Sequence, residues 1–275
     1  SMKNKNILIL VVAVLALAGL AAFLCWQNGK VAVEPEQTNI EQPSGAVPSG
    51  GEKVSIVSAS QSDNFYNIRV EYPQFKDADP VFNQKIADLI NGQIENFKKE
   101  AKENFDARNA TMPEGGTVLQ EPEQPFDFIA AWTPDQPDAN YLSFVLDVYY
   151  FSGGAHGISQ IFAFNYDLTN KKEITISDFL GSMENLNKLS KMAQDQVLAQ
   201  LRSNGMEMND SIAQMAHEGT KPVWENYRNF TFGSDKLTLY FEQYQAAPGS
   251  AGTITVVFSK DDLEQNGIVS NYFGR

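Results

Sequence analysis

The hydrophobic and polar positions of this chain follow two different periods, which together predict strands and helices. Alternation with a period of two, or a short apolar run bounded by turn residues, is typical of a strand. Such runs predict strands at 54–57, 66–72, 126–132, 141–151, 161–167, 173–176, 237–241 and 253–258. Pro73 is expected to end the second of these strands. The run at 141–151 is almost continuously apolar, so both of its faces are expected to be covered.

Two longer segments show the helical period. Asp79 before Pro80 is a good helix start, because aspartate accepts from free N–H groups at the N-cap and proline suits the first helical position. An apolar stripe follows at spacings of three and four, formed by Ile86, Leu89, Ile90, Ile94 and Phe97. The second helix aligns Leu186, Leu189, Ala193, Val197 and Leu201, and it is expected to stop at Asn204 and Gly205. A short helix is expected over 206–216.

Strands and helices do not alternate in a regular strand–helix–strand rhythm. This order predicts an α+β fold with mixed or antiparallel sheets and two main amphipathic helices, and it argues against a doubly wound sheet.

The first 52 residues predict a membrane segment and a tether. Residues 7–26 carry no charge and are rich in Leu, Val and Ala, and about 20 apolar residues span a bilayer. Lys3 and Lys5 precede this run, so we expect residues 1–6 to be a cytoplasmic stub and the folded domain to be extracytoplasmic. The alternative is a cleaved signal peptide, which would leave the domain secreted. Residues 27–52 are rich in Pro, Gly, Glu and Ser and predict a flexible linker.

Charge narrows the class of partner. The formal net charge is −13, which argues against nucleic acid and favours either a cationic partner or simply solubility. Cys25 is the only cysteine and lies in the apolar run, so the exported part has no disulfide.

Candidate chemistry centres on the corner after residue 151, where glycines surround one of the two histidines. No nucleophile, phosphate-binding or zinc motif is present, so no catalytic residue, metal ligand or cofactor is assigned. His156 and His217 are far apart in sequence. His156 with a carboxylate such as Asp147 would suit acid–base work, but nothing in the spacing selects that pair. A structural or ligand-contacting role for His156 is the preferred interpretation.

Several motifs carry a family resemblance. The sequences Ile-Arg-Val-Glu-Tyr-Pro at 68–73 and Ser-Gly-Gly-Ala-His-Gly at 152–157 resemble the PdaC-type domain, also called DUF4163. The motifs at 164–168, 176–180 and 244–252 resemble the DUF3298 domain that usually follows it. We therefore place a PdaC-like domain at 53–158 and a DUF3298-like domain at 159–275.

The same pair of domains forms the extracytoplasmic part of the RsiV-type anti-sigma factors, which bind lysozyme. The resemblance implies a membrane-anchored binding module for a cell-envelope ligand, either a peptidoglycan fragment or a lysozyme-like cationic protein, without catalysis of its own. The alternative is an envelope hydrolase or deacetylase that uses His156 and nearby carboxylates. The candidate binding residues are Tyr150, Ser152, Gly153, Gly154, His156, Tyr244 and Pro248.

Overall fold

The structure, a computed structural model, describes residues 53–113, 116–135 and 140–273. All of these belong to one compact unit. The segments predicted at 1–6, 7–26 and 27–52 lie outside the described residues. Within the described ranges, no helix combines the length and the apolar composition needed to cross a membrane.

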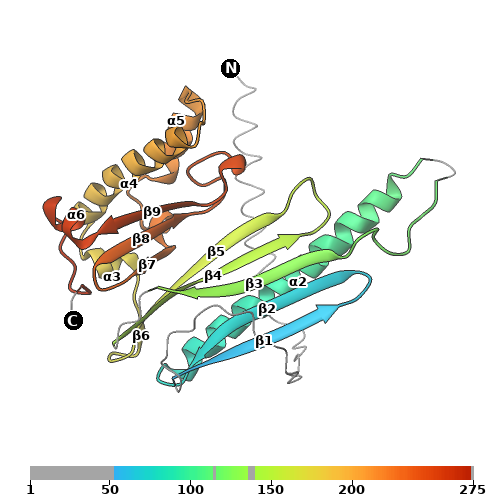
Figure 1. Cartoon of the computed structure of the whole chain (residues 1–275), viewed down its shortest axis with the longest axis horizontal. Coiled ribbons are helices and arrows are strands. Elements are labelled where there is room, and N and C mark those ends of the chain that lie inside the picture. Colours follow the sequence, from blue (N-terminus) through green and yellow to red (C-terminus); the bar gives the residue numbers. More distant parts are fainter. Residues whose placement is uncertain (1–52, 114–115, 136–139, 274–275) are drawn as a thin grey trace, which may run out of the picture. The chain divides into compact units, whose positions relative to one another are not determined.

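The first part of the chain forms a mixed six-stranded sheet (Figure 1). Its strands, in both spatial and chain order, are β1 (Val54–Ser62), β2 (Tyr66–Phe75), β3 (Phe126–Pro134), β4 (Tyr141–Phe151), β5 (Ile158–Asp167) and β6 (Lys172–Glu173). The β2–β3 pair is parallel and the other pairs are antiparallel. Parallel neighbours need a crossover, and the helix α2 (Pro80–Ala110) supplies it.

Helix α2 begins where the sequence predicts. The Asp79 carboxylate accepts a hydrogen bond from the Val81 N–H at 2.8 Å, and proline occupies the first turn. Three residues of the predicted stripe are buried and the other two, Leu89 and Ile94, are partly buried. The stripe continues beyond the prediction through Ala101 and Phe105. It packs on one face of the first sheet, which buries a core of its own.

The second part of the chain builds a separate core around a three-stranded antiparallel sheet. Its elements are α3 (Ile176–Leu180), α4 (Met183–Ser203), α5 (Asp210–Gly219), η1 (Trp224–Tyr227), β7 (Phe230–Phe232), β8 (Lys236–Phe241), η2 (Gly249–Ala251), β9 (Ile254–Ser259) and α6 (Lys260–Gln265). Helix α4 buries all five residues of its predicted stripe and ends at Asn204, with Gly205 at a φ of +78°. The short helix α5 runs later than the predicted 206–216, because Asn209 caps it.

Two strand predictions are wrong. Strand β2 does not stop at Pro73, which pairs with Ile56 of β1. Its pairing with β3 ends at Val70, so the missing N–H of proline removes no ladder bond on that side. The strand predicted at 173–176 ends at Glu173, because Thr175 forms a capping box with Asp178 and starts α3.

The expectation that both faces of β4 are covered is correct only in part. Val145 and Leu146 are both buried, although they face opposite sides of the sheet. Further along the strand, Asp147 and Tyr149 are exposed. This uncovered end of β4 leads directly into the glycine-rich corner.

Hydrogen bonds join the two sheets through β7. The Phe232 N–H donates to Ser143 Oγ at 2.9 Å, and Asn165 Nδ2 donates to the Phe230 carbonyl at 2.7 Å. Asp135, which follows β3, accepts from Thr231 Oγ1 at 2.6 Å and pairs with Lys236 at 2.8 Å. These contacts fix the second sheet against β4 and β5.

Candidate functional site

Part of the predicted site anchors the corner to α2. Ser152 is buried, and its hydroxyl donates to Glu100 Oε1 at 2.7 Å. Asn104 Nδ2 donates to the Ser152 carbonyl at 3.0 Å. Gly153 has a φ of +94°, in the region that favours glycine, and the Phe126 ring packs where a β-carbon would lie. These residues shape the loop from its inner side.

Tyr150 also faces inward, and Gly154 is exposed beside His156. The Tyr150 ring lies 6.1 Å from that of Phe97 in α2. Burial raises the pKa of the Tyr150 hydroxyl, and the negative charge of Glu100 adds to the increase. Tyr150 therefore belongs to the packing between sheet and helix.

His156 lies on the exposed side of the corner and reaches the second half of the chain. Its Nδ1 lies 2.9 Å from the Gly157 carbonyl and its Nε2 lies 3.4 Å from the Tyr244 hydroxyl. A carbonyl only accepts, so Nδ1 is the donor in the first contact, and in the neutral ring Nε2 is then left to accept from the tyrosine. The structure thus brings together His156 and Tyr244, two predicted site residues that are 88 positions apart.

Two exposed tyrosine rings lie near this histidine, and each packs on a glycine. A β-carbon on Gly157 would meet the Tyr149 ring at 2.3 Å, and one on Gly249 would meet the Tyr244 ring at 2.1 Å. Tyr149 is 41% exposed and Tyr244 is 56% exposed. Both glycines are needed for close packing of a ring, not for a left-handed backbone.

Asp147 adds a carboxylate to the same surface. It precedes Tyr149 by two residues, so both side chains leave the same face of β4. Asp147 forms no hydrogen bond or ion pair with the described part of the chain. Desolvation by its neighbours raises its pKa even though part of the residue is exposed. Its charge also acts on Tyr240 of β8, whose pKa is raised chiefly by burial.

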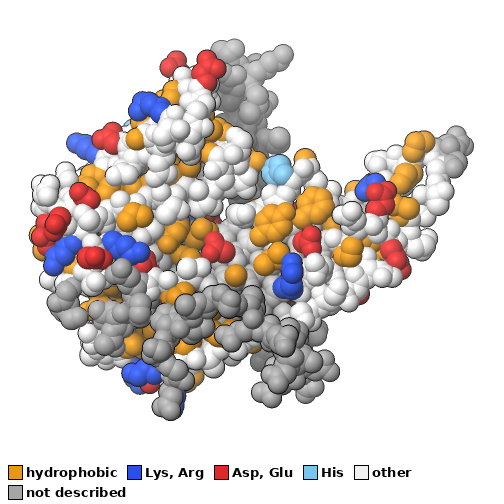
Figure 2. Space-filling model, in the orientation of Figure 1, with side chains coloured by type: hydrophobic (Ala, Val, Ile, Leu, Met, Phe, Trp, Pro, Cys, Tyr) orange, Lys and Arg blue, Asp and Glu red, His pale blue; other side chains and the backbone are white. Residues whose placement is uncertain are grey.

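A hollow of about 300 Å³ lies beside Tyr244. It includes Arg228 and Glu242, which form an ion pair on its wall. Pro248 is half-buried and precedes the short helix η2, which carries Gly249 under the tyrosine ring. Figure 2 shows a histidine exposed on one face of the molecule, with hydrophobic and acidic side chains around it. Within the described ranges, no group of three or more His, Cys, Asp or Glu side chains is placed to hold a metal ion.

Sequence reasoning missed the residues that complete this surface. Tyr149 looked like part of a buried run, and Gly157 and Gly249 stood in the glycine corner and in the 244–252 motif without pointing to a tyrosine ring. The available signal was the period of β4, because Asp147 and Tyr149 share one parity while the buried Leu146 and Val148 share the other. The pairing of each glycine with a tyrosine ring had no signal in the sequence.

Comparison with known proteins identifies both halves. Residues 59–159 match the family model described as "Deacetylase PdaC". Residues 177–261 match that of "Protein of unknown function (DUF3298)". The chain carries a PdaC domain followed by a DUF3298 domain. His156 and Tyr149 thus lie in the PdaC match, and Tyr244 and Gly249 lie in the DUF3298 match.

A curated relative contains the same region. The peptidoglycan-N-acetylmuramic acid deacetylase PdaC of Bacillus subtilis is 26% identical over 212 residues, which are 77% of this chain and 41% of that protein. The chain thus spans about two-fifths of its relative.

Solved structures share the fold across both domains. A DUF3298 family member from Bacteroides fragilis superposes with a TM-score of 0.53 at 15% identity, over 78% of this chain and 93% of that one. A DUF3298 family protein from Pseudomonas aeruginosa PAO1 gives a TM-score of 0.50 at 16% identity, over 81% and 97%.

Proposed function

We propose that this protein is an extracytoplasmic binding module that captures a cell-envelope ligand at the surface formed by Tyr149, His156 and Tyr244. The observation that carries the proposal is the pair of exposed tyrosine rings near the histidine, one within 3.4 Å of its ring and the other packed on the next residue, Gly157. Tyrosine combines a large apolar face with a polar end and is enriched at recognition surfaces. Because the rings come from different domains, a ligand here contacts both.

Charge favours a basic protein of the lysozyme type over a neutral ligand. The chain has a net charge of −13, and Asp147 offers a carboxylate that has no partner among the described residues. A cation beside aromatic rings and a carboxylate gains both cation–π and ionic attraction. The resemblance to RsiV-type proteins supports the same partner class. A predicted anchor at 7–26 and linker at 27–52 would hold the module outside the membrane.

A deacetylase or hydrolase is the second candidate. One comparison and one structural observation favour it. The curated relative is named for deacetylation of peptidoglycan. Burial raises the pKa of Asp147, and a carboxyl group with a raised pKa is a candidate general acid or base. His156 would be its acid–base partner.

Titration of the full chain with lysozyme tests the first proposal. We expect saturable binding that weakens as salt rises, because rim charges mainly speed encounter and are screened. Tyr149→Ala and Tyr244→Ala should each weaken binding about tenfold or more, the loss of ~1.4 kcal/mol. Ile56→Ala is the control, since Ile56 is 45% exposed on β1, which β2 and β3 separate from β4.

Two further arms separate the alternatives. Binding of a muropeptide with the same tyrosine dependence, and none of lysozyme, would assign the surface to a glycan. Acetate release from peptidoglycan that disappears in His156→Ala would establish the enzyme. If the full chain binds neither ligand and releases no acetate, the surface is not the functional site.

A further inference from the structure

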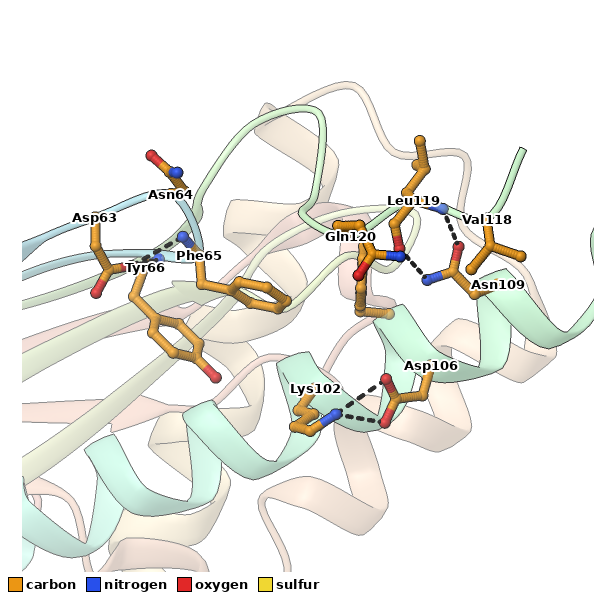
Figure 3. Close-up of a pocket in the computed structure, with 11 residues that line it drawn as sticks. Asp63, Asn64, Phe65, Tyr66, Lys102, Asp106, Asn109, Val118, Leu119 and Gln120 are labelled. Atoms are coloured by element: carbon orange, nitrogen blue, oxygen red, sulfur yellow. Dashed lines mark hydrogen bonds and ion pairs between the residues drawn. The ribbon is translucent and has the colours of Figure 1, made fainter.

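A second, larger hollow lies in the PdaC domain, apart from the tyrosine surface. Its volume is about 920 Å³. Three segments line it: the turn between β1 and β2, the C-terminal turns of α2, and residues 118–120 (Figure 3). Ligand pockets in proteins typically measure about 300–1,000 Å³.

Hydrogen bonds fix each wall of this hollow. Asp63 accepts from the N–H groups of Phe65 and Tyr66 at 2.8 and 2.7 Å, which sets the turn. Asn109 bonds both backbone groups of Leu119, with its Nδ2 3.0 Å from the carbonyl and its Oδ1 3.1 Å from the N–H. Residues 118–120 belong to no helix or strand, and the Asn109 side chain bonds the Leu119 backbone as a neighbouring strand would. The hollow therefore exists before any ligand arrives.

The lining combines aromatic rings with uncommitted polar groups. Figure 3 shows the rings of Phe65 and Tyr66 on one side and Gln120 on the other, with Lys102 below. Gln120 and Asn64 are exposed amides that make no hydrogen bond within the described ranges. Each offers both a donor and an acceptor.

The charges of the lining add up to one negative charge. Asp63 and Asp106 carry two negative charges and Lys102 one positive, and Lys102 is held by Asp106 at 2.7 Å. Hydrogen bonds from Gln61 and from the Tyr66 and Phe65 N–H groups lower the pKa of Asp63, so this carboxylate stays ionised well below neutral pH. An acidic ligand would be repelled here.

We propose that this hollow is a binding site for a short neutral oligosaccharide. Sugar rings have apolar C–H faces that stack on aromatic side chains, and their hydroxyl or acetamide groups need neighbours that both donate and accept. Phe65 and Tyr66 supply the first feature. Gln120 and Asn64 both donate and accept, and the carboxylates of Asp63 and Asp106 add acceptors. Both sites lie at the same end of the first sheet, but none of Tyr149, His156 and Tyr244 lines this hollow, so the proposal does not depend on the function proposed for the tyrosine surface.

The test is calorimetric titration of the full chain with the tetramer of N-acetylglucosamine. Val118 lies in the lining and is 58% exposed, so Val118→Trp should fill the hollow without disturbing the core. We expect this variant to lower affinity at least tenfold. Val269→Trp is the matched control, because Val269 is 67% exposed in the DUF3298 half, and it should bind as the parent does.

Milder variants test the individual contacts. Gln120→Ala and Asn64→Ala should each lower affinity by about two- to tenfold, the usual range for one neutral hydrogen bond. An acidic oligosaccharide, such as a galacturonic acid tetramer, should bind more weakly than the neutral one.

Three results would overturn the proposal. One is the absence of saturable binding by the neutral tetramer at millimolar concentration. Another is binding that Val118→Trp leaves unchanged, which would place the sugar elsewhere. If only Tyr244→Ala abolished sugar binding, the sugar would be placed at the tyrosine surface. The third is tighter binding of the acidic tetramer than of the neutral one.

Discussion

Two glycines decide where two exposed tyrosine rings lie. A methyl group on Gly249 would occupy the space of the Tyr244 ring, and the ring is free to swing toward solvent because the residue is exposed. The position of the ring is therefore sensitive to a change that leaves the core intact. The same argument applies to Gly157 and Tyr149.

Gly249→Ala should weaken lysozyme binding about as much as Tyr244→Ala does, with little change in the free energy of unfolding. Gly92→Ala provides the control, since an added β-carbon there meets nothing within 4 Å. Alanine in a helix is favoured over glycine by about 0.5–1 kcal/mol, so Gly92→Ala should stabilise the fold and leave binding unchanged. Equal binding by Gly249→Ala and the parent would show that the ring position is not important.

The pKa of Asp147 has opposite consequences for stability and for binding. Because the folded-state pKa is raised above the unfolded value, the folded state holds the proton more tightly. Its contribution to stability is therefore full below the unfolded pKa and is lost as pH rises through the folded pKa. Binding of a cation needs the ionised form, so it should strengthen over the same window.

Asp147→Asn should remove both effects. At neutral pH we expect the variant to unfold at a higher urea concentration than the parent, because a desolvated charge is gone. Lysozyme binding should fall and should no longer strengthen as pH rises above the ordinary carboxyl pKa. A variant less stable than the parent at neutral pH would contradict the desolvated state of this carboxylate.

Elements with a complete local pattern are predictable from this sequence, and elements defined by distant partners are not. Helix α4 combines an apolar stripe, a start at Ser182 and a stop at Gly205, so its place follows from the residues alone. Strand β7 has three residues, and only its pairing with β8 and its bonds to Ser143 and Asn165 make it a strand. Likewise, β4 looks fully apolar until the exposure of Tyr149 shows which end stays uncovered.

The start of α2 can be tested by Asp79→Ala. Loss of the hydrogen bond to the Val81 N–H should lower the free energy of unfolding by about 1 kcal/mol. Asp88→Ala in the same helix is the comparison, because Asp88 is exposed and bonds only the side chain of Gln84 among the described residues. Urea unfolding should separate the two variants. Equal midpoints would mean that Pro80 alone sets the start of the helix.

Polar side chains, one of them largely buried, join the two domains. The Asp135 side chain is only 6% exposed and holds Lys236 and Thr231 of the DUF3298 half. If the two domains shifted apart, the Thr231 hydroxyl and the Lys236 ammonium would lose the Asp135 carboxylate, which is their shared acceptor. The contact is therefore specific as well as attractive. Lys236 and Thr231 belong to the same sheet as Tyr240 and precede Tyr244 in the chain, so the joint also positions half of the tyrosine surface.

Asp135→Ala should therefore destabilise the protein by about 2 kcal/mol. Glu173→Ala breaks the exposed ion pair with Lys85, in which both side chains are about half exposed. Such surface pairs contribute about 0–1 kcal/mol, so this control should unfold almost as the parent does. If thermal unfolding shows the same midpoint for both variants, the joint does not stabilise the fold.

The parallel pairing of β2 with β3 also sets an order of events during synthesis. Asn67 bonds Asp127, 60 positions later, so β2 has no partner on that side until α2 and the following loop have been made. Until then, the β1–β2 hairpin has an unpaired edge at β2 and an apolar face that is exposed to other chains. Such intermediates bind chaperones or aggregate. We therefore expect nascent chains that end before residue 126 to aggregate more readily than longer ones, in which β3 can pair with β2.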